Sequence, residues 1–223
     1  MTERDFSRGL SMFNPDMYKD KKVWIIGAGW IGSNSAYALA KMWVKIKVCD
    51  FDKVDLVNTS SQFYSIEQVG MPKVEALKEN ILKMCNEDIE VIDWEFKPED
   101  FEDCDILVLA LDSLEVRKNV VLSSKDTQFI LDTRMFKELS IVNTLYGFQR
   151  DTRMEKERRE DADEIDQGTV CTEKAVAFNA LCMGWLVGKL TSYYLNSLDN
   201  ELPPLKYSYV LDLSNMQLHC FNS

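Results

Sequence analysis

A glycine-rich turn directly after an apolar segment constrains the fold of this chain more than any other feature. Residues 23–26 (VWII) have the character of a buried strand, and Gly27, Gly29 and Gly32 follow at G-x-G-x-x-G spacing. Glycines at these positions let the backbone approach phosphate closely, and the helix N-terminus behind them offers unpaired N–H groups and partial positive charge. The turn predicts a nucleotide-binding α/β fold and leaves NAD, FAD and ATP open.

Strand and helix patterns alternate through the first 131 residues. The run at 105–111 is almost continuously apolar, as central parallel strands tend to be. This alternation predicts a doubly wound, Rossmann-like, mostly parallel sheet in a single domain covering 1–223. The expected strands are 23–26, 45–50, 90–96, 105–111 and 129–131, and the expected helices are 31–43, 72–84 and 113–122.

The second half of the chain has a different character. Residues 150–166 are mostly charged and contain almost no large apolar side chain, so they cannot bury enough surface to order themselves. We interpret about 149–170 as a mobile loop that crosses over the domain, with a solvated linker as the alternative. The other expected elements are a strand at 140–146, a helix at 172–190 and an antiparallel hairpin formed by 205–213 and 216–221.

Composition excludes several classes of function. A net charge of −11 argues against a nucleic-acid partner, because phosphate neutralisation needs clustered Lys and Arg. No apolar run approaches the ~20 residues needed to cross a bilayer, and the first residues carry no apolar signal segment, so we expect a cytoplasmic protein. The six cysteines form no C-x-x-C pair, which disfavours structural zinc, and the single His219 excludes mechanisms that need two histidines.

Polar residues follow the second strand. Asp50 ends that strand about twenty residues past the turn, where an acid accepts ribose hydroxyls. Asp52 adds a second acid, and Asn58 and Gln62 follow in polar context. Lys73 supplies a mobile point charge suited to polyphosphate, although a solvated lysine is the alternative for this residue taken alone.

Asp112 ends the long apolar strand, at the edge of the sheet where open α/β folds bind ligands. A carboxylate at this edge can hold magnesium between phosphate oxygens. The alternative for a single aspartate before a helix is a capping role.

These residues together resemble the ThiF/MoeB family, which includes the ubiquitin-activating enzymes. The resemblance is close over about 20–140 and is carried by KVWIIGAGWIGSNSAYALA, VCDFDKVDLVNTSSQF, GMPKVEALKENI and ALDSLEVRKN. The pattern D-x-D-x-V-x-x-x-N-x-x-x-Q followed by G-x-x-K is much more specific than the glycine turn. The resemblance implies ATP- and Mg²⁺-dependent adenylation of the C-terminal carboxylate of a small ubiquitin-like or sulfur-carrier protein. It also implies a homodimer, or a heterodimer with a related subunit.

The resemblance implies a role for each matching residue. Arg8 resembles an N-terminal arginine that family members insert into the ATP site of the partner subunit. The remaining roles are the nucleotide turn for Gly27, Gly29 and Gly32, ribose binding for Asp50, phosphate contact for Asn58 and Lys73, magnesium binding for Asp112, and membership of the nucleotide motif for Asp52 and Gln62.

The chain also departs from the family pattern. The family usually has N-x-x-R-Q, and here Ser61 stands in place of the arginine, with Arg117 or Arg134 as candidate substitutes. Trp30 stands where members often have a further glycine, and we expect its ring to pack outside the sheet, with a position covering the nucleotide as the alternative. These departures leave a non-catalytic subunit of a heterodimeric activating enzyme as an alternative function. An NAD-dependent oxidoreductase explains the glycines and Asp50, but gives Asn58, Lys73 and Asp112 no shared purpose.

Cys171 is the candidate nucleophile. It lies where the charged segment gives way to the apolar helix, and Thr172 is a plausible N-cap. A cysteine beside a helix N-terminus has a thiol pKa lowered into a range of about 3.5–7.5. The sequence before it, 168–171, is similar to the catalytic-cysteine region of an enzyme that activates a ubiquitin-like modifier. We therefore expect a thioester at Cys171 that passes to a downstream acyl acceptor, with an incidental thiol as the alternative.

Overall fold

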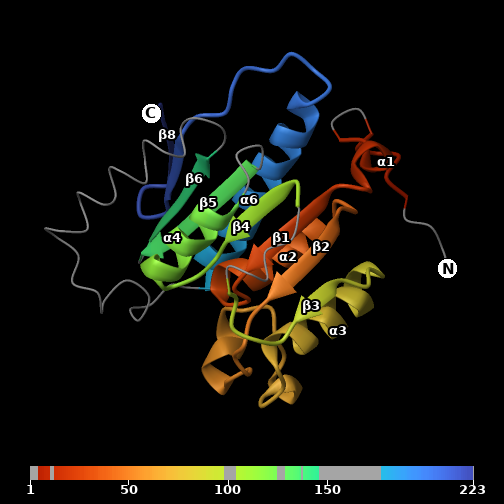
Figure 1. Cartoon of the computed structure of the whole chain (residues 1–223), viewed down its shortest axis with the longest axis vertical. Helices are drawn as coiled ribbons and strands as arrows, with labels where there is room; N and C mark the ends of the chain where they lie inside the picture. The colour runs from red at the N-terminus through yellow and green to blue at the C-terminus, as the bar shows by residue number, and fades with distance from the viewer. Residues whose placement is uncertain are drawn as a thin grey trace, which may run out of the picture.

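The computed structural model describes residues 5–10, 13–97, 104–124, 129–136, 138–145 and 177–222. Its centre is one eight-stranded sheet with the strand order β3-β2-β1-β4-β5-β6-β7-β8, shown in Figure 1. The strands are β1 (Lys22–Ile26), β2 (Lys45–Cys49), β3 (Glu90–Ile92), β4 (Ile106–Leu109), β5 (Phe129–Phe136), β6 (Leu139–Leu145), β7 (Ser208–Asp212) and β8 (Gln217–Phe221).

Helices connect the parallel strands. The α-helices are α1 (Pro15–Tyr18), α2 (Trp30–Ala40), α3 (Lys73–Cys85), α4 (Leu114–Ser123) and α6 (Ala177–Ser197), and two 3₁₀ helices, η1 (Leu56–Ser60) and η2 (Ile66–Gln68), lie between β2 and α3. None of the helices in the described ranges is both long and apolar enough to span a bilayer.

The sheet is parallel on one side and antiparallel on the other. Strands β3, β2, β1, β4 and β5 run in parallel, and β6, β7 and β8 continue the sheet in antiparallel pairing. The predicted doubly wound sheet with antiparallel C-terminal strands is confirmed. Chain order reverses between β1 and β4, so the crevice at their carboxyl ends is the topological switch point where such folds bind ligands.

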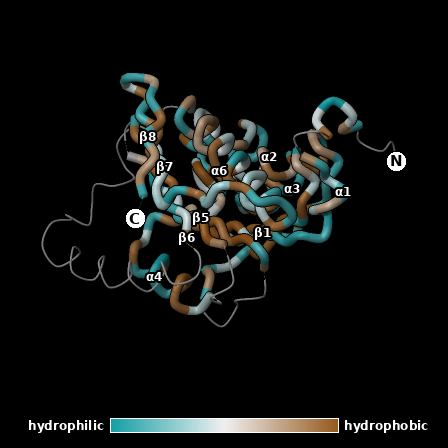
Figure 2. Tube along the Cα trace, turned by 90° about the horizontal axis from the view of Figure 1, so that it is seen from above, coloured by the Kyte–Doolittle hydropathy of each residue, from teal (hydrophilic) through white to brown (hydrophobic). Residues whose placement is uncertain are grey.

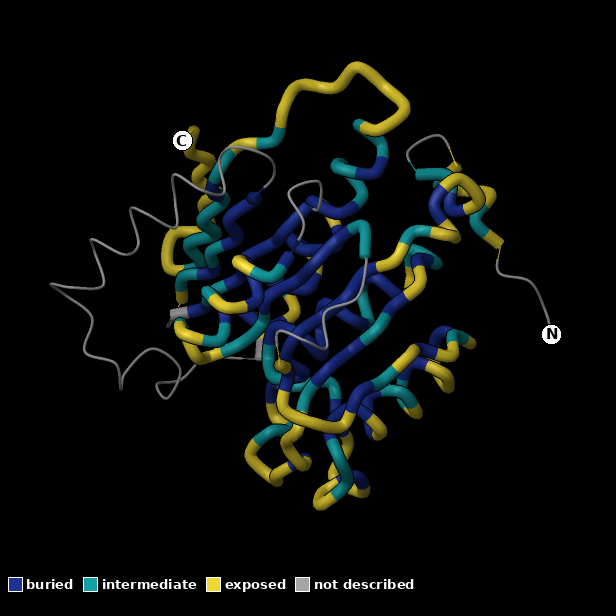
Figure 3. The backbone as a smooth tube through the Cα atoms, in the orientation of Figure 1, coloured by how far each residue is buried: buried dark blue, intermediate teal, exposed yellow. Residues whose placement is uncertain are grey.

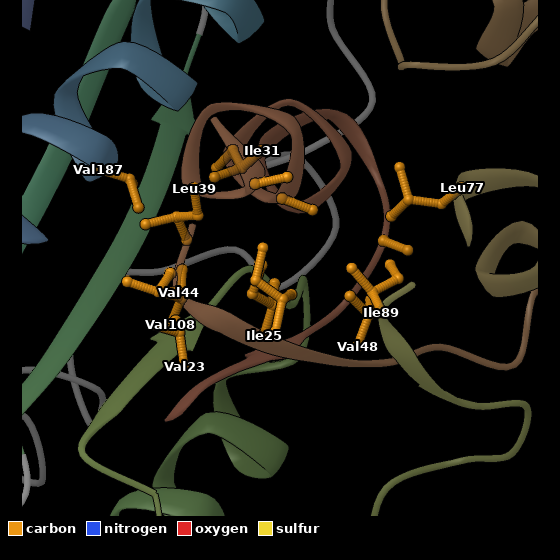
Figure 4. Packing of buried hydrophobic residues seen from close by; sticks show 14 of the residues in the cluster. Val23, Ile25, Ile31, Leu39, Val44, Val48, Leu77, Ile89, Val108 and Val187 are labelled. Carbon is orange, nitrogen blue, oxygen red and sulfur yellow. The ribbon is translucent and has the colours of Figure 1, made fainter. Parts of the chain in front are cut away.

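The central strands β1 and β4 are almost entirely apolar because helices cover both of their faces. Figure 2 shows α2, α3 and α6 on one face of the sheet and α4 on the other. In β1, Val23 and Ile25 pack under α2, while Trp24 and Ile26 pack towards α4. Figure 4 shows Ile25 beneath Ile31 and Leu39 of α2. Burial is deepest in these central strands and ends at β8, an exposed edge strand, as Figure 3 shows.

Helices α2 and α6 lie against each other at a glycine. A Cβ atom at Gly184 would lie 2.7 Å from the carbonyl oxygen of Asn34, so a larger residue there would force the two backbones apart. Helix α2 follows directly after residues 27–29 of the glycine-rich turn. The long C-terminal helix therefore directly supports the helix behind that turn.

Several predicted boundaries are wrong. Helix α2 ends at Ala40, because Trp43 takes a left-handed φ of 64° and its ring stacks on Phe6 with centroids 5.6 Å apart. Helix α3 ends at Cys85, one residue beyond the predicted end, and Cys85 is buried because it lies four residues after Ile81 on the same helix face.

Strand lengths also differ from the prediction. Strands β3 and β4 are shorter than expected, and β5 is longer because its second half pairs with β6 beyond the end of β4. The crossover segment at 149–170 and the start of the helix expected from 172 lie outside the described residues.

Candidate nucleotide-binding site

The carboxyl ends of β1, β2 and β4 meet at one edge of the sheet. The Gly27 N–H donates to the Cys49 carbonyl at 2.8 Å, and the Ala110 N–H donates to the Ile26 carbonyl at 2.8 Å. These bonds join the residue after β1 to the end of β2, and the residue after β4 to the end of β1. The glycine turn, Asp50 and Asp112 are therefore brought to the same edge, at the switch point.

Each of the three glycines in the turn meets a different environment. Gly27 has a φ of +98°, and a Cβ there would lie 2.3 Å from the Ala110 carbonyl oxygen. A Cβ at Gly32 would lie 1.8 Å from the Gly27 carbonyl oxygen, whereas a Cβ at Gly29 would meet nothing within 4 Å. Gly27 and Gly32 are thus required by packing, and Gly29 borders open space at the start of α2. Trp30 is partly buried and packs against the hydrophobic core.

Asp50 is held by backbone groups on both sides. Its Oδ2 accepts a hydrogen bond from the Ala28 N–H at 2.6 Å, and its Oδ1 accepts one from the Asp52 N–H at 2.8 Å. A carboxylate oxygen has further lone pairs, so ribose hydroxyls can still donate to it. The structure thus fixes a half-buried acceptor beside the turn, where the sequence predicts ribose binding.

Tyr64 is part of this site and was not predicted from sequence. Its hydroxyl donates to the Ala28 carbonyl at 2.6 Å, and the side chain is buried. Burial raises the pKa of Tyr64 well above its usual value, and the nearby charges of Asp50 and Asp52 raise it further. Tyr64 belongs to no motif, so no signal in the sequence distinguishes it from a core aromatic residue.

Lys73 is buried and paired. Its Nζ lies 2.7 Å from Asp52 Oδ2, and its side chain is 9% exposed against 51% for Asp52. Its N–H, at the first residue of α3, donates to the Asp52 carbonyl at 2.8 Å. The alternative of a solvated lysine is wrong, and the structure places a cation beside the second acid of the motif.

The two amides of the motif differ in how their groups are used. Asn58 lies in η1, where its Oδ1 accepts from the Asp55 N–H at 2.8 Å. Gln62 has a buried Oε1 that receives no hydrogen bond within the described part of the chain. A buried acceptor of this kind calls for a donor such as a ligand hydroxyl or a bound water. The side chain of Ser61 is buried, and its carbonyl accepts from Asn34 Nδ2 at 3.2 Å.

Asp112 is exposed between β4 and α4. The N-cap of α4 is Ser113, whose Oγ accepts from the Val116 N–H at 3.3 Å, so the predicted alternative of a capping role for Asp112 is wrong. The Asp112 carboxylate makes no hydrogen bond or ion pair to any other described residue. It is therefore available to a cation at the same sheet edge as Asp50.

The two candidate substitute arginines share Asp132. Arg117 is buried, and its Nη1 donates to Asp132 Oδ1 at 2.5 Å and to the Leu109 carbonyl at 3.2 Å, while its Nη2 donates to the Leu111 carbonyl. Arg134 Nη2 lies 3.2 Å from Asp132 Oδ2, the other oxygen of the same carboxylate. With its guanidinium bound to protein acceptors, Arg117 does not fit the role of the missing phosphate-binding arginine.

One predicted site residue, Arg8, is not brought to this edge. Arg8 is exposed. It belongs to the short segment before α1, which Figure 1 shows beside α1 in red. Cys171 lies outside the described residues. Among those described, no three His, Cys, Asp or Glu residues are grouped so as to hold a metal ion between them.

Comparison with known proteins places this geometry in a family. Residues 14–130, more than half of the chain, match the sequence model of the ThiF family. Ubiquitin-like modifier-activating enzyme 5 of Caenorhabditis briggsae is 30% identical over 94 residues, covering 42% of this chain and 22% of that protein. SUMO-activating enzyme subunit 2 of Dictyostelium discoideum is 31% identical over 121 residues, covering 50% of this chain and 18% of that protein. The matched part thus spans about a fifth of these relatives.

Solved structures share the fold over nearly the whole chain. E. coli MccB, in a crystal with AMPCPP and MccA, superposes with a TM-score of 0.72 at 18% identity, covering 93% of this chain and 65% of MccB. PaaA superposes with a TM-score of 0.71 at 22% identity, covering 92% of this chain and 73% of PaaA. At these identities the likeness establishes the α/β fold.

Proposed function

This chain belongs to the ThiF family, and from that membership we propose that it uses ATP and Mg²⁺ to adenylate the C-terminal carboxylate of a small ubiquitin-like or sulfur-carrier protein. The observation that carries the proposal is a grouping at one sheet edge: a fixed acid (Asp50), a buried cation (Lys73) and an unpaired carboxylate (Asp112). An NAD-dependent enzyme needs the first of these and has no use for the other two. Relatives named as activating enzymes support the same class of reaction.

The chain's own groups would bind ATP in a defined order along the edge. Asp50 accepts from the ribose, the N–H groups at the start of α2 face the phosphates, and Lys73 offsets their charge. A carboxylate oxygen of the carrier then forms a bond to the α-phosphorus as the bond to the pyrophosphate oxygen breaks. The reaction needs positioning and charge neutralisation more than proton transfer, which suits a chain with one histidine.

Asp112 is the residue we assign to Mg²⁺. Magnesium is usually held in such sites by one or two carboxylates together with phosphate oxygens and waters, so a single unpaired carboxylate fits it. The buried Gln62 Oε1, which receives no hydrogen bond within the described residues, can accept from a bound water or a ribose hydroxyl. Bound magnesium supplies positive charge that lowers the repulsion between the phosphates and the incoming carboxylate.

We further propose that Cys171 accepts the acyl group. The thiolate attacks the acyl carbonyl, AMP leaves, and a thioester forms that a downstream acceptor can take up. The support is the position of Cys171 in the sequence, before a long helix and after a charged segment. A carrier adduct that survives denaturing gel electrophoresis, is cleaved by thiol reductant and is lost in Cys171→Ala would support the step. An adduct unaffected by Cys171→Ala would exclude it.

The proposed unit is a dimer, either of two copies or with a related subunit, and the cytoplasm is its proposed location. One face of α6 presents Phe178, Leu181 and Trp185, each more than half exposed, at helical spacing. An apolar stripe of this kind on a helix usually marks a contact surface. Light scattering after gel filtration should show a dimer that Trp185→Glu dissociates, whereas a wild-type monomer would argue for a heterologous partner.

Thermal stabilisation by nucleotide tests the adenylation proposal before the carrier is known. ATP with Mg²⁺ at a hundredfold excess over its dissociation constant should stabilise the native state by about 2.7 kcal/mol. The shift should fall to about 1.4 kcal/mol or less in Asp112→Ala, where ATP·Mg²⁺ binds at least about tenfold more weakly, and NADH should give none. Stabilisation by NADH alone would overturn the proposal in favour of an oxidoreductase.

A non-catalytic subunit remains the second candidate because of Ser61. Its buried side chain stands where the family has a phosphate-binding arginine, and Arg117 does not replace that arginine. Absence of stabilisation by either nucleotide would favour this candidate. Restoration of ATP binding by Ser61→Arg would then identify the missing arginine as the cause.

A further inference from the structure

Arg117 binds the backbone on both sides of Ala110, just before Asp112. It is the fourth residue of α4, and its guanidinium donates to the carbonyls of Leu109 and Leu111. The Leu109 carbonyl also accepts from Thr133 Oγ1 at 2.6 Å. The end of β4 is thus tied to α4 and to β5 at once.

The connection from β4 to α4 is held at nearly every residue except Asp112. Between the two carbonyls bound by Arg117, the Ala110 N–H donates to the Ile26 carbonyl at 2.8 Å. After Asp112, Ser113 caps α4, and its carbonyl accepts from the Arg117 N–H at 3.1 Å. The side chain of Asp112 alone is left without a partner in the described structure. Its backbone is therefore fixed from both sides while its carboxylate stays available.

Asp132 holds the guanidinium in place. The side chains of Arg117 and Asp132 are 9% and 6% exposed, and Arg134 binds the second oxygen of the same carboxylate. A buried arginine whose planar fork meets one carboxylate and two carbonyls is rigid, because each N–H has a fixed direction. A lysine would keep the charge but, as a point donor, could not span the three acceptors.

We propose that Arg117 is a positioning residue for Asp112: through the Leu109 and Leu111 carbonyls it sets where the Asp112 carboxylate meets the metal ion of bound ATP. This inference rests on the proposed ATP·Mg²⁺ function. A metal ligand placed on a loop needs such support, because losing the residues that orient a ligand typically weakens metal binding markedly. Arg117 acts only on the metal-dependent part of nucleotide binding.

The test compares ATP affinity with Mg²⁺ and with EDTA. In Arg117→Lys, ATP·Mg²⁺ should bind at least about tenfold more weakly, while ATP in EDTA binds as in wild type. Asp112→Ala should show the same pattern. In the double variant, Arg117→Lys should cause no further loss, because its effect passes through a carboxylate that is no longer present.

A matched control removes an ion pair at the other end of β4. Lys21 pairs with Asp105 at 2.8 Å there, and Lys21→Met should leave both affinities unchanged. Should Arg117→Lys fail to fold, Asp132→Asn keeps the shape of the side chain and weakens the hold on Arg117. It should then show a smaller loss confined to the Mg²⁺ measurement.

The outcomes separate this inference from the proposed function. Equal loss of affinity with and without Mg²⁺, or losses that add in the double variant, would overturn the positioning role and leave the ATP proposal intact. A wild-type protein that binds ATP equally with Mg²⁺ and EDTA would overturn both the metal assignment and the role of Arg117. Wild-type protein that binds no ATP would overturn the proposed function itself.

Discussion

Replacing Gly32 by alanine should destabilise the protein far more than the same change at Gly29. An added Cβ at position 32 lies 1.8 Å from the Gly27 carbonyl oxygen, and the opposing atom is backbone. To restore a contact of ordinary length, the start of α2 must retreat from the turn by more than about 1 Å. A flexible side chain could rotate away, but neither backbone can.

The packing of α2 prevents an easy retreat. Ile31 and Leu39 are buried against the sheet, with Ile25 beneath them (Figure 4), and Gly184 of α6 closes the other side. Overpacking of a core usually costs 1–3 kcal/mol, and the contact with backbone puts Gly32→Ala at about 3 kcal/mol or more. For a chain of this size, that lowers the Tm by about 6–12 °C.

Gly29→Ala is the matched control. Nothing lies within 4 Å of its added Cβ, and its φ is negative, so the added methyl group meets no neighbouring atom. As the N-cap of α2, it should cost about 1 kcal/mol or less in stability. Its methyl group, however, would occupy the open space at the start of α2, so ATP affinity should fall at least about tenfold.

Two measurements on both variants decide the matter. Far-UV circular dichroism gives the Tm, and isothermal titration with ATP and Mg²⁺ gives the affinity. A Gly32→Ala protein within 1 °C of wild type would refute the steric argument. A Gly29→Ala protein with wild-type ATP affinity would show that phosphate does not approach the turn at this residue.

Three further variants probe the surroundings of the turn. Tyr64→Phe removes the bond to the Ala28 carbonyl and should cost about 0.5–1.5 kcal/mol at pH 8 in urea denaturation. The pKa of Tyr64 is raised in the folded state, so its contribution to stability is complete below pH 10 and is lost as pH rises further. The difference in unfolding free energy between wild type and Tyr64→Phe should therefore narrow above pH 10. A constant difference would contradict this assignment. Lys73→Met leaves Asp52 half-exposed and hydrated, so the Tm should change little. Titration calorimetry should show ATP binding about 10–100-fold weaker, and an affinity equal to wild type would exclude Lys73 from the phosphate site. Asp50→Asn turns an amide N–H₂ towards the backbone N–H of either Ala28 or Asp52 and should cost about 1–3 kcal/mol in urea denaturation. An unchanged urea midpoint would exclude these two hydrogen bonds to Asp50.

Local patterns in the sequence were sufficient for the fold and for much of the site. The strand before the turn is apolar because both faces of β1 are covered, and the glycines are where the chain turns into α2. Asp50 follows a strand that lies beside β1, so its distance along the chain predicted its place in space. These features depend on short segments and on the regular geometry of parallel strands.

The contacts missed from sequence join residues that only the fold brings together. Tyr64 reaches the Ala28 carbonyl across 36 residues, and neither residue differs in type from ordinary core positions. Asp132 is a lone acid in an apolar strand, and its pairing with Arg117 depends on β4 and β5 being neighbours. Sheet order, not residue pattern, selects such partners.

The ion pair between Lys73 and Asp52 changes what nucleotide binding means at this edge. The ammonium group already has an anion beside it before any phosphate arrives. Under the proposed function, ATP binding would therefore exchange one anion for another around a buried cation, and the half-exposed Asp52 would return to water. The pair balances the charge of Lys73 with a residue of the protein itself, so under the proposed function ATP would have to compete with Asp52.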